Sequence, residues 1–316
     1  MARPRLMLIG AGSMGANHAR VAAASDRVDL TVLVDPRKSV AKPLADRYGA
    51  LWASEPDFSR VDAVIVAAAT EAHPEIAARV IEAGKPMLME KPLAAGLDET
   101  RAIVQASAAK GLPLMCGFVE RYNPAVVTAR SLMEDPSYII AQRHSPYVQR
   151  IRTGVAWDLL VHDVDLSIQL LGSIPTDVHS TLGFFSPHSL DDAEDVADVI
   201  MGFESGAMAN VSAARIGQRK VRTILIHEKA RLIELDLLRR DITLYHHVSS
   251  DSLTDDGRGY KQQTIIEIPE LITNQEPLSA QLDRFVDILE GSVDADVERA
   301  SILPSHEVIA AVKGRA

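Results

Sequence analysis

The chain has 316 residues, of which 47% are hydrophobic and 24% are charged, and its formal net charge at pH 7 is −10. This length exceeds what one hydrophobic core usually holds, so two domains are expected. The negative charge argues against a nucleic-acid partner, because phosphates require a basic surface.

A single cysteine, Cys116, excludes an intramolecular disulfide, and its apolar neighbours predict a packed strand residue rather than a reactive thiol. No Cys/His cluster has the spacing of a zinc site, so no metal is expected. The N-terminus enters a strand without a signal-peptide pattern, and no uncharged apolar stretch reaches the roughly 18 residues that a membrane helix needs. We therefore expect a soluble, cytoplasmic protein with no membrane partner.

The first eighteen residues follow the order strand, glycine turn, helix. The apolar run 6–9 is followed by Gly10, Gly12 and Gly15 in the spacing Gly-x-Gly-x-x-Gly, and then by Ala-rich, helix-forming sequence. Gly10 suits the tight turn, Gly12 the close approach of a pyrophosphate, and Gly15 the packing of helix on strand. The phosphates would bind the free N–H groups at the N-terminus of that helix.

A second β-type run, 30–34, ends at Asp35, which is 20 residues after Gly15. An acidic residue at this distance is placed to hydrogen-bond the adenosine ribose hydroxyls, although an N-cap or turn aspartate is the alternative. A carboxylate here repels a 2′-phosphate and favours NAD, whereas Arg37 could pair with that phosphate and leaves NADP open. We interpret residues 5–35 as a dinucleotide-binding βαβ unit.

Strand and helix patterns alternate through residue 118, which predicts a parallel sheet covered on both faces. Beyond that point apolar residues alternate along strand pairs, which predicts an antiparallel sheet with one covered face. The expected fold class is α/β: an N-terminal doubly wound Rossmann domain over 1–118, and a C-terminal α+β domain over 119–316 with a large, mostly antiparallel, open-faced sheet. The C-terminal helix could pack back on the first domain.

The expected elements follow from these patterns. Helices are expected over 39–48, 74–83, 98–110, 124–133, 157–171, 277–289 and 305–312. Strands are expected over 63–68, 86–89, 112–116, 138–144, 196–203, 207–214, 221–226, 232–237 and 242–246, and a polar loop is expected over 251–258.

Two groups of polar residues could carry chemistry. Asp158 and His162 stand four apart in a helical stretch, so they share a face and can hydrogen-bond. Oxidation of an alcohol by a nicotinamide needs a base, and histidine, whose pKa is near neutral, is the natural one. Lys91, at a predicted strand end, could hold the substrate hydroxyl and favour its deprotonated form. From spacing alone such a pair is more often a surface feature, and we interpret Asp163 and Asp165 as exposed helix charges.

The sequence resembles the glucose–fructose oxidoreductase/inositol dehydrogenase/MocA family, closely over residues 5–175 and in architecture beyond. The resemblance rests on Gly10-Ala11-Gly12-Ser13-Met14-Gly15 with His18, the loop from Thr70 to His73, Glu90-Lys91-Pro92-Leu93, Gly117-Phe118-Val119-Glu120-Arg121-Tyr122-Asn123-Pro124, and Gly154-Val155-Ala156-Trp157-Asp158-Leu159-Leu160-Val161-His162.

The resemblance implies an NAD(P)-dependent dehydrogenase that acts on a CH–OH group of a sugar, a cyclitol or a nucleotide-sugar. It also implies a homodimer or homotetramer formed through the open face of the second sheet. Lys91, Asp158 and His162 become the expected catalytic set, with His162 as the base. The expected cofactor-binding residues are Gly10, Gly12, Ser13, Met14, Gly15, Asp35, Arg37, Ala68, Thr70, His73, Glu90 and Lys91, and the expected substrate-binding residues are Lys91, Arg121, Tyr122, Trp157, Asp158 and His162.

The chain departs from the family pattern in three places. Thr153 replaces a common glycine, and Ala69 replaces a common proline. Leu160 also replaces a common glycine, and because leucine is larger, it could narrow the substrate pocket. The segments 121–124 and 162–165 look most like the branch acting on UDP-N-acetylglucosamine.

Two alternative functions remain at this point. One is a non-catalytic NAD(P)-binding regulatory protein, and the other is an imine or biliverdin-type reductase on the same fold. The Asp158/His162 pair weighs against the second, because such reductions need no alcohol deprotonation. The sequence leaves open the sugar, the carbon oxidised, the direction in the cell, and dimer against tetramer.

Overall fold

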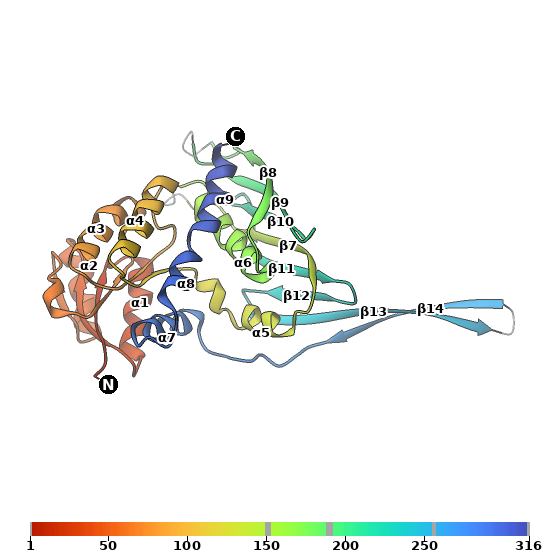
Figure 1. Cartoon of the computed structure of the whole chain (residues 1–316), viewed down its shortest axis with the longest axis horizontal. Helices are drawn as coiled ribbons and strands as arrows, with labels where there is room; N and C mark the ends of the chain where they lie inside the picture. The colour runs from red at the N-terminus through yellow and green to blue at the C-terminus, as the bar shows by residue number, and fades with distance from the viewer. Residues whose placement is uncertain (1, 149–152, 188–191, 255–256, 315–316) are drawn as a thin grey trace. The chain divides into compact units, whose positions relative to one another are not determined.

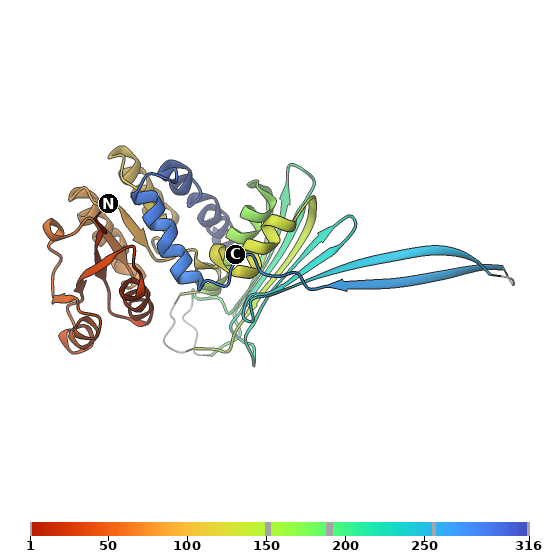
Figure 2. The same cartoon turned by 90° about the horizontal axis from the view of Figure 1, so that it is seen from below.

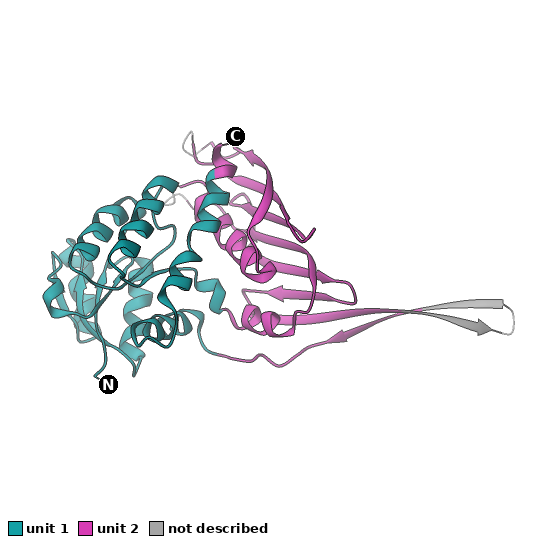
Figure 3. Ribbon diagram, viewed as in Figure 1, with its two compact units in different colours: residues 1–122, 275–310 teal, residues 123–274, 311–316 magenta. Residues whose placement is uncertain are grey.

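The computed structural model describes residues 2–148, 153–187, 192–254 and 257–314, with backbone alone for 249–254 and 257–261. The chain divides into two compact units (Figure 3). Unit 1 contains Met1–Tyr122 and Gln275–Ala310, and unit 2 contains Asn123–Asn274 and Ala311–Ala316. The chain therefore leaves unit 1 after Tyr122, returns to it at Gln275, and passes again into unit 2 at Ala311.

Unit 1 contains a six-stranded parallel sheet flanked by helices (Figure 1). Its first part consists of β1 (Arg5–Ile9), α1 (Ser13–Ala24), β2 (Asp29–Val34), α2 (Lys38–Arg47), β3 (Leu51–Ala53), η1 (Phe58–Arg60), β4 (Ala63–Val66), η2 (Thr70–Ala72), α3 (His73–Glu82), β5 (Met87–Met89), α4 (Leu97–Ala109), β6 (Leu114–Cys116) and η3 (Val119–Tyr122). The strand order is β3-β2-β1-β4-β5-β6, which is that of a Rossmann fold. The order reverses between β1 and β4, and ligands of such sheets bind beyond the strand ends at that point.

The C-terminal helices complete unit 1. They are α7 (Pro277–Leu289), α8 (Ala295–Ala300) and α9 (Leu303–Gly314), the last four residues of α9 lying in unit 2. Leu282 and Phe285 of α7 are buried in the same core as Leu6 and Leu8 of β1. Burial of these side chains, worth about 2 kcal/mol each, attaches the returning segment to the sheet. Cys116 is 3% exposed within β6, which confirms that it is a packed strand residue.

Unit 2 contains an eight-stranded sheet in the order β14-β13-β12-β11-β7-β10-β9-β8. Its elements are α5 (Pro124–Leu132), β7 (Pro136–His144), the π-helical turn η4 (Ala156–Leu160), α6 (Val161–Leu171), β8 (Pro175–Gly183), β9 (Val196–Phe203), β10 (Met208–Ala214), β11 (Val221–Glu228), β12 (Leu232–Asp236), β13 (Asp241–Thr254) and β14 (Gly257–Glu267). All neighbouring pairs are antiparallel except β10 and β7, which are parallel. The expected large, mostly antiparallel sheet is confirmed.

Helices α5 and α6 cover one face of this sheet (Figure 2). Along β9, Ala197, Val199 and Met201 are buried, whereas Ile200, which points to the other face, is 45% exposed. Met208 on the adjacent strand β10 is 46% exposed. The period-two alternation thus marks a helix-covered face and an open face.

Some elements differ from the prediction. The polar loop expected over 251–258 is wrong for its described residues, because β13 continues to Thr254 and β14 begins at Gly257, with antiparallel pairing; residues 255 and 256 lie outside the described residues. Strands β3 and β8 and helix α8 had not been predicted. Across the described ranges, no helix is long and apolar enough to cross a membrane.

Candidate active site

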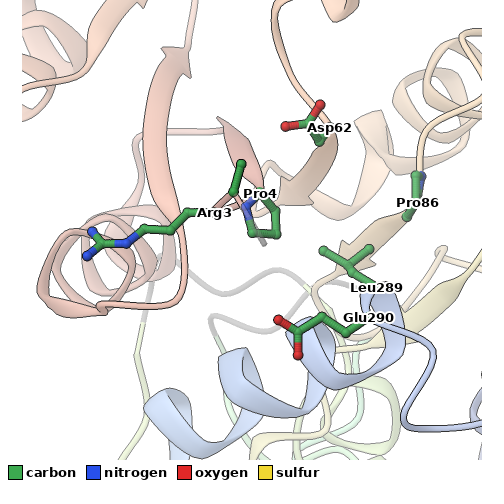
Figure 4. Close-up of a pocket in the computed structure, with 7 residues that line it drawn as sticks. Arg3, Pro4, Asp62, Pro86, Leu289 and Glu290 are labelled. Atoms are coloured by element: carbon green, nitrogen blue, oxygen red, sulfur yellow. The ribbon is translucent and has the colours of Figure 1, made fainter.

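A cavity lined by Arg3, Pro4, Asp62, Pro86, Leu289 and Glu290 opens in unit 1 (Figure 4). Pro4, Asp62 and Pro86 immediately precede β1, β4 and β5, so this cavity lies at the amino ends of the strands. Ligands of doubly wound sheets bind at the opposite edge, beyond the carboxyl ends. The cofactor site is therefore expected at the loops that follow β1, β2, β4 and β5.

The glycine loop after β1 has one glycine that faces open space and two that are held by packing. A Cβ at Gly10 would lie 2.4 Å from the carbonyl oxygen of Ala67, and Gly10 has a φ of +104°. A Cβ at Gly15 would lie 2.0 Å from the carbonyl oxygen of Gly10. A Cβ at Gly12 would meet no atom within 4 Å. Gly10 and Gly15 therefore serve the fold, and Gly12 leaves room for a ligand.

The N-terminus of α1 is suited to an anion. Gly12 is its N-cap residue and offers no side-chain cap, and the first turn carries no acidic residue. Ser13 and Met14, in that first turn, are exposed. The first N–H groups of a helix need an acceptor, and a pyrophosphate is a strong one. These features fit the phosphates of a dinucleotide.

Asp35 follows β2 and is 4% exposed. Its carboxylate accepts the backbone N–H of Ala11 at 2.9 Å and is bound by Arg37 through Nε at 3.0 Å and Nη2 at 2.8 Å. The hydrogen bond from the Arg37 side chain is the largest cause that lowers the pKa of Asp35 to about 2. The carboxylate is therefore ionised at neutral pH, where it can accept ribose hydroxyls. The Arg37 side chain is 61% exposed.

The loops after β4 and β5 meet at a buried histidine. His73 places Nε2 3.3 Å from the carbonyl oxygen of Ala68 and Nδ1 3.1 Å from that of Pro92. Burial, the largest effect, lowers the pKa of His73, so the ring stays neutral and donates through only one nitrogen. His73 can therefore hydrogen-bond the backbone of only one of the two loops, and it packs against the other. Thr70 and Ala68, in the first loop, are half-buried.

The segment that contains Lys91 is held on both sides. Before it, the Glu90 carboxylate accepts from Nε2 of His18 at 2.7 Å, with both side chains less than one-tenth exposed. After a cis Lys91–Pro92 peptide bond, the N–H of Leu93 lies 3.4 Å from Nε2 of His306 on α9. Lys91 itself is half-buried.

His306 acts as an acceptor at this point because of its protonation state. Its Nδ1 donates to the carbonyl oxygen of Ile302 at 2.8 Å, which leaves Nε2 free to accept from Leu93. Burial lowers the pKa of His306 to about 4, so the ring is neutral near pH 7. No local signal in the sequence marks His306 as a neighbour of the Lys91 segment, which is 213 residues away.

Arg121 and Tyr122, predicted to bind substrate, lie in η3 of unit 1. Arg121 is 9% exposed and donates to the hydroxyl of Ser301 at 2.8 Å, and its guanidinium lies 4.8 Å from the centre of the Phe118 ring. These contacts join η3 to the end of α8. Tyr122 is half-buried. Their contact with substrate stays a prediction.

Unit 2 presents Trp157, Asp158 and His162 where η4 passes into α6. Asp158 lies in the π-helical turn and His162 in the first turn of α6; π turns of this kind occur often at functional sites. Trp157 is 8% and His162 9% exposed, and the side chain of Asp158 is 22% exposed. Arg215 forms an ion pair with Asp158, with Nη2 3.8 Å from Oδ2. No local pattern marks Arg215, which is 57 residues from Asp158, as its partner.

The interpretation of Asp163 and Asp165 as exposed helix charges is wrong, because they are 2% and 1% exposed. Asp163 forms a two-point ion pair with Arg143 of β7, with distances of 2.7 and 2.8 Å. Arg143 is also 2% exposed, so the pair is fully desolvated. In the described part of the chain, no group of three His, Cys, Asp or Glu side chains could hold a metal ion.

Together, the sheet order, the open glycine loop and the ionised Asp35 are those of a dinucleotide-binding protein, here with a second, largely antiparallel domain. The sequence model "Oxidoreductase family, NAD-binding Rossmann fold" (GFO_IDH_MocA) matches residues 5–118, and "GFO/IDH/MocA C-terminal domain" matches residues 125–233. The chain belongs to this family. It is therefore an NAD-dependent oxidoreductase that acts on a CH–OH group, with NAD bound by the Rossmann domain.

The chain is similar to several characterised relatives. It is 28% identical over 249 residues to a UDP-N-acetylglucosamine 3-dehydrogenase of Acidithiobacillus ferrooxidans, covering 78% of each chain. It is 28% identical over 230 residues to an inositol 2-dehydrogenase of Rhizobium meliloti, covering 67% of this chain and 68% of the relative. A solved structure of the Acidithiobacillus ferrooxidans enzyme superposes with a TM-score of 0.83 at 25% identity, over 99% of both chains. A levoglucosan dehydrogenase in complex with NADH gives a TM-score of 0.80 at 22% identity, over 99% of this chain and 98% of that one, which shows the shared fold.

Proposed function

We propose that the chain oxidises a secondary alcohol of a nucleotide-linked amino sugar of the UDP-N-acetylglucosamine type. The observation that carries the proposal is the buried helix start in unit 2, which holds Asp158 and His162 one helical turn apart. A carboxylate beside a histidine is the arrangement that fixes the tautomer of a general base. The likeness to the UDP-N-acetylglucosamine 3-dehydrogenase, which extends over 99% of both chains, supports the substrate class.

In this proposal His162 takes the proton of the substrate hydroxyl, and Asp158 stabilises the imidazolium that forms. Lys91 donates a hydrogen bond to the same oxygen and stabilises its developing negative charge. Bound NAD would supply the acceptor for the hydride that leaves the carbon, so that a C=O bond replaces the C–H and O–H bonds. The reaction requires Lys91 of unit 1 and His162 of unit 2 to reach one substrate oxygen.

Leu160 was expected from the sequence to narrow the substrate pocket. It is fully buried in the turn that carries Asp158, so its side chain packs in the core of unit 2. Its effect on substrate size stays a prediction.

Substrate choice is tested by the rate of NADH formation with four alcohols: UDP-N-acetylglucosamine, UDP-glucose, free N-acetylglucosamine and myo-inositol. We expect UDP-N-acetylglucosamine to have the highest kcat/KM, by at least about tenfold, because a site that hydrogen-bonds a substrate group rejects analogues lacking it. Turnover of myo-inositol with none of UDP-N-acetylglucosamine would contradict the substrate class. Binding of NADH without turnover of any alcohol would favour a non-catalytic role.

We also propose that the chain forms a homodimer or homotetramer through the open face of the unit 2 sheet, and that it works in the cytoplasm. Ile200 and Met208 support the interface, because both are large, apolar and nearly half exposed on that face. Light scattering after gel filtration measures the mass directly. Changing both residues to glutamate should reduce it to that of a monomer, and an unchanged mass would place the interface elsewhere.

A further inference from the structure

A fully buried carboxylate lies against the start of the turn that carries Asp158. Glu194, just before β9, is 0% exposed. Its Oε1 accepts the backbone N–H of Ala156 at 2.7 Å, and its backbone oxygen accepts the N–H of Val155 at 3.0 Å. Ala156 is the first residue of η4, whose own N-cap residue provides no side-chain acceptor. Glu194 therefore supplies, from a distant part of the sequence, the negative charge that a helix start favours.

The contact also explains a glycine. A Cβ at Gly154 would lie 2.2 Å from the carboxylate oxygens of Glu194, so any side chain at this position would have to displace that carboxylate. The main chain from Gly154 to Ala156 is thus pressed against this one side chain. Any movement of the Glu194 carboxylate would change the position of the turn that follows.

The charge of Glu194 is balanced by a lysine from the end of the chain. Lys313, in the last turn of α9, places Nζ 2.6 Å from Oε2 of Glu194, and its side chain is 20% exposed. Nζ also donates to the backbone oxygen of Asp192 at 2.9 Å and lies 3.4 Å from its carboxylate. Burial works to lower the pKa of Lys313, but the hydrogen bond and the charge of Glu194 outweigh it and the pKa is raised. Lys313 is therefore charged at neutral pH.

We propose that Lys313 is a positioning residue for the Asp158/His162 pair and acts through Glu194. The inference rests on the proposed function, in which His162 is the base. A buried carboxylate without a cation is strongly unfavourable, so loss of Lys313 destabilises the Glu194 carboxylate in its present place. Displacement of this carboxylate weakens the acceptor of the Ala156 N–H and loosens the turn. Because proton transfer depends on alignment, the chemical step slows while cofactor binding is preserved.

The test compares Lys313→Met with Lys313→Arg, and with Lys42→Met as a matched control. Lys42 also forms an ion pair, with Nζ 2.7 Å from Asp46, but both side chains are about half exposed. We expect Lys313→Met to lower kcat by between about tenfold and about 100-fold, with KM and the Kd for NADH close to wild type. Lys313→Arg should recover most of the rate, because it restores the charge. A merely structural role would lower the melting temperature without this split between kcat and KM.

A second readout needs no substrate. Hydrogen–deuterium exchange of the peptide over 154–160 should become at least about tenfold faster in Lys313→Met and stay unchanged in Lys42→Met. The double variant Glu194→Gln/Lys313→Met removes both charges and keeps an acceptor for Ala156, so its exchange should return towards wild type. Wild-type exchange in Lys313→Met, or a lowered kcat that Lys313→Arg does not restore, would overturn the inference. An inactive wild-type protein with the expected exchange pattern would instead overturn the proposed function.

Discussion

The glycine loop provides the sharpest test of how the chain binds its cofactor, because Gly12 faces open space whereas Gly15 is packed against the backbone of Gly10. In Gly12→Ala, the added methyl group meets no atom within 4 Å, and φ at this position is −72°, so the folded state should be perturbed by no more than about 1 kcal/mol. The same methyl group would stand where the pyrophosphate approaches the N–H groups of α1. Loss of one or two charge-assisted hydrogen bonds, at about 1.5–3 kcal/mol each, raises the Kd for NADH by at least about tenfold.

Gly15→Ala should instead lower the stability of the folded state. Its Cβ would lie 2.0 Å from the Gly10 carbonyl oxygen, whereas ordinary contact begins at 3.4 Å, so α1 would have to move by about 1.4 Å. Overpacking against backbone costs about 2 kcal/mol or more, and the melting temperature should fall by about 5 °C or more.

Isothermal titration with NADH and thermal melting of the three proteins separate these effects. The reasoning is refuted if Gly12→Ala binds NADH with wild-type affinity, or if it melts as low as Gly15→Ala. In the first case the phosphates do not approach Gly12, and in the second the glycine is needed for packing.

Three further variants test the charges around the site. The pKa of His306 is lowered from 6.5 to about 4, so the folded state resists protonation, and the free energy of unfolding falls by up to about 3 kcal/mol as the pH falls from 6.5 to 4. The urea midpoint of His306→Gln should therefore depend less on pH over this range than that of the wild type. The same pH dependence of the urea midpoint in both proteins would contradict this assignment. Asp163→Asn removes the carboxylate charge that pairs with the buried Arg143 and should lower the free energy of unfolding by about 3 kcal/mol without changing the Kd for NADH. A loss below about 1 kcal/mol in chemical denaturation would show that the pair is solvated. Asp35→Asn should raise the Kd for NADH about tenfold, because the ribose loses an ionised acceptor, and the ratio of the Kd for NADPH to the Kd for NADH should become smaller. Equal affinities for NADH in the variant and the wild type would exclude Asp35 from the ribose site.

The prediction from sequence succeeded where apolar periodicity was strong. The strands β1, β2 and β4 are buried on both faces and read as continuous apolar runs, and α7 was predicted with its observed bounds, 277–289. Elements at sheet edges were missed, because they bury little. In β8 only Val178 is buried, at 8%, and no alternation marks the strand. The continuation of β13 lies in a polar segment, where backbone pairing alone defines the strand.

The candidate site was predictable only to the extent that local motifs specify it. The glycine spacing and Asp35 are local patterns, and the structure gives each the surroundings that a dinucleotide needs. The partners that hold these motifs in place come from distant segments: Arg215 lies beside Asp158, and Lys313 is 119 residues from Glu194. Asp163 was misjudged for the same reason, because its charge is balanced by Arg143, 20 residues earlier on β7. Contacts between side chains far apart in the sequence produce no local sequence pattern from which they could be predicted.

The central claim is that Lys91 and His162 act on the alcohol while NAD binds independently of them. It is tested most directly by NADH formation from UDP-N-acetylglucosamine in the wild type, Lys91→Ala and His162→Asn, each with its Kd for NADH measured in parallel. Both variants should lose at least about 100-fold in kcat, the size of a general-base or electrostatic contribution, with the Kd for NADH within about threefold of wild type. Wild-type turnover in either variant would exclude that residue from the reaction.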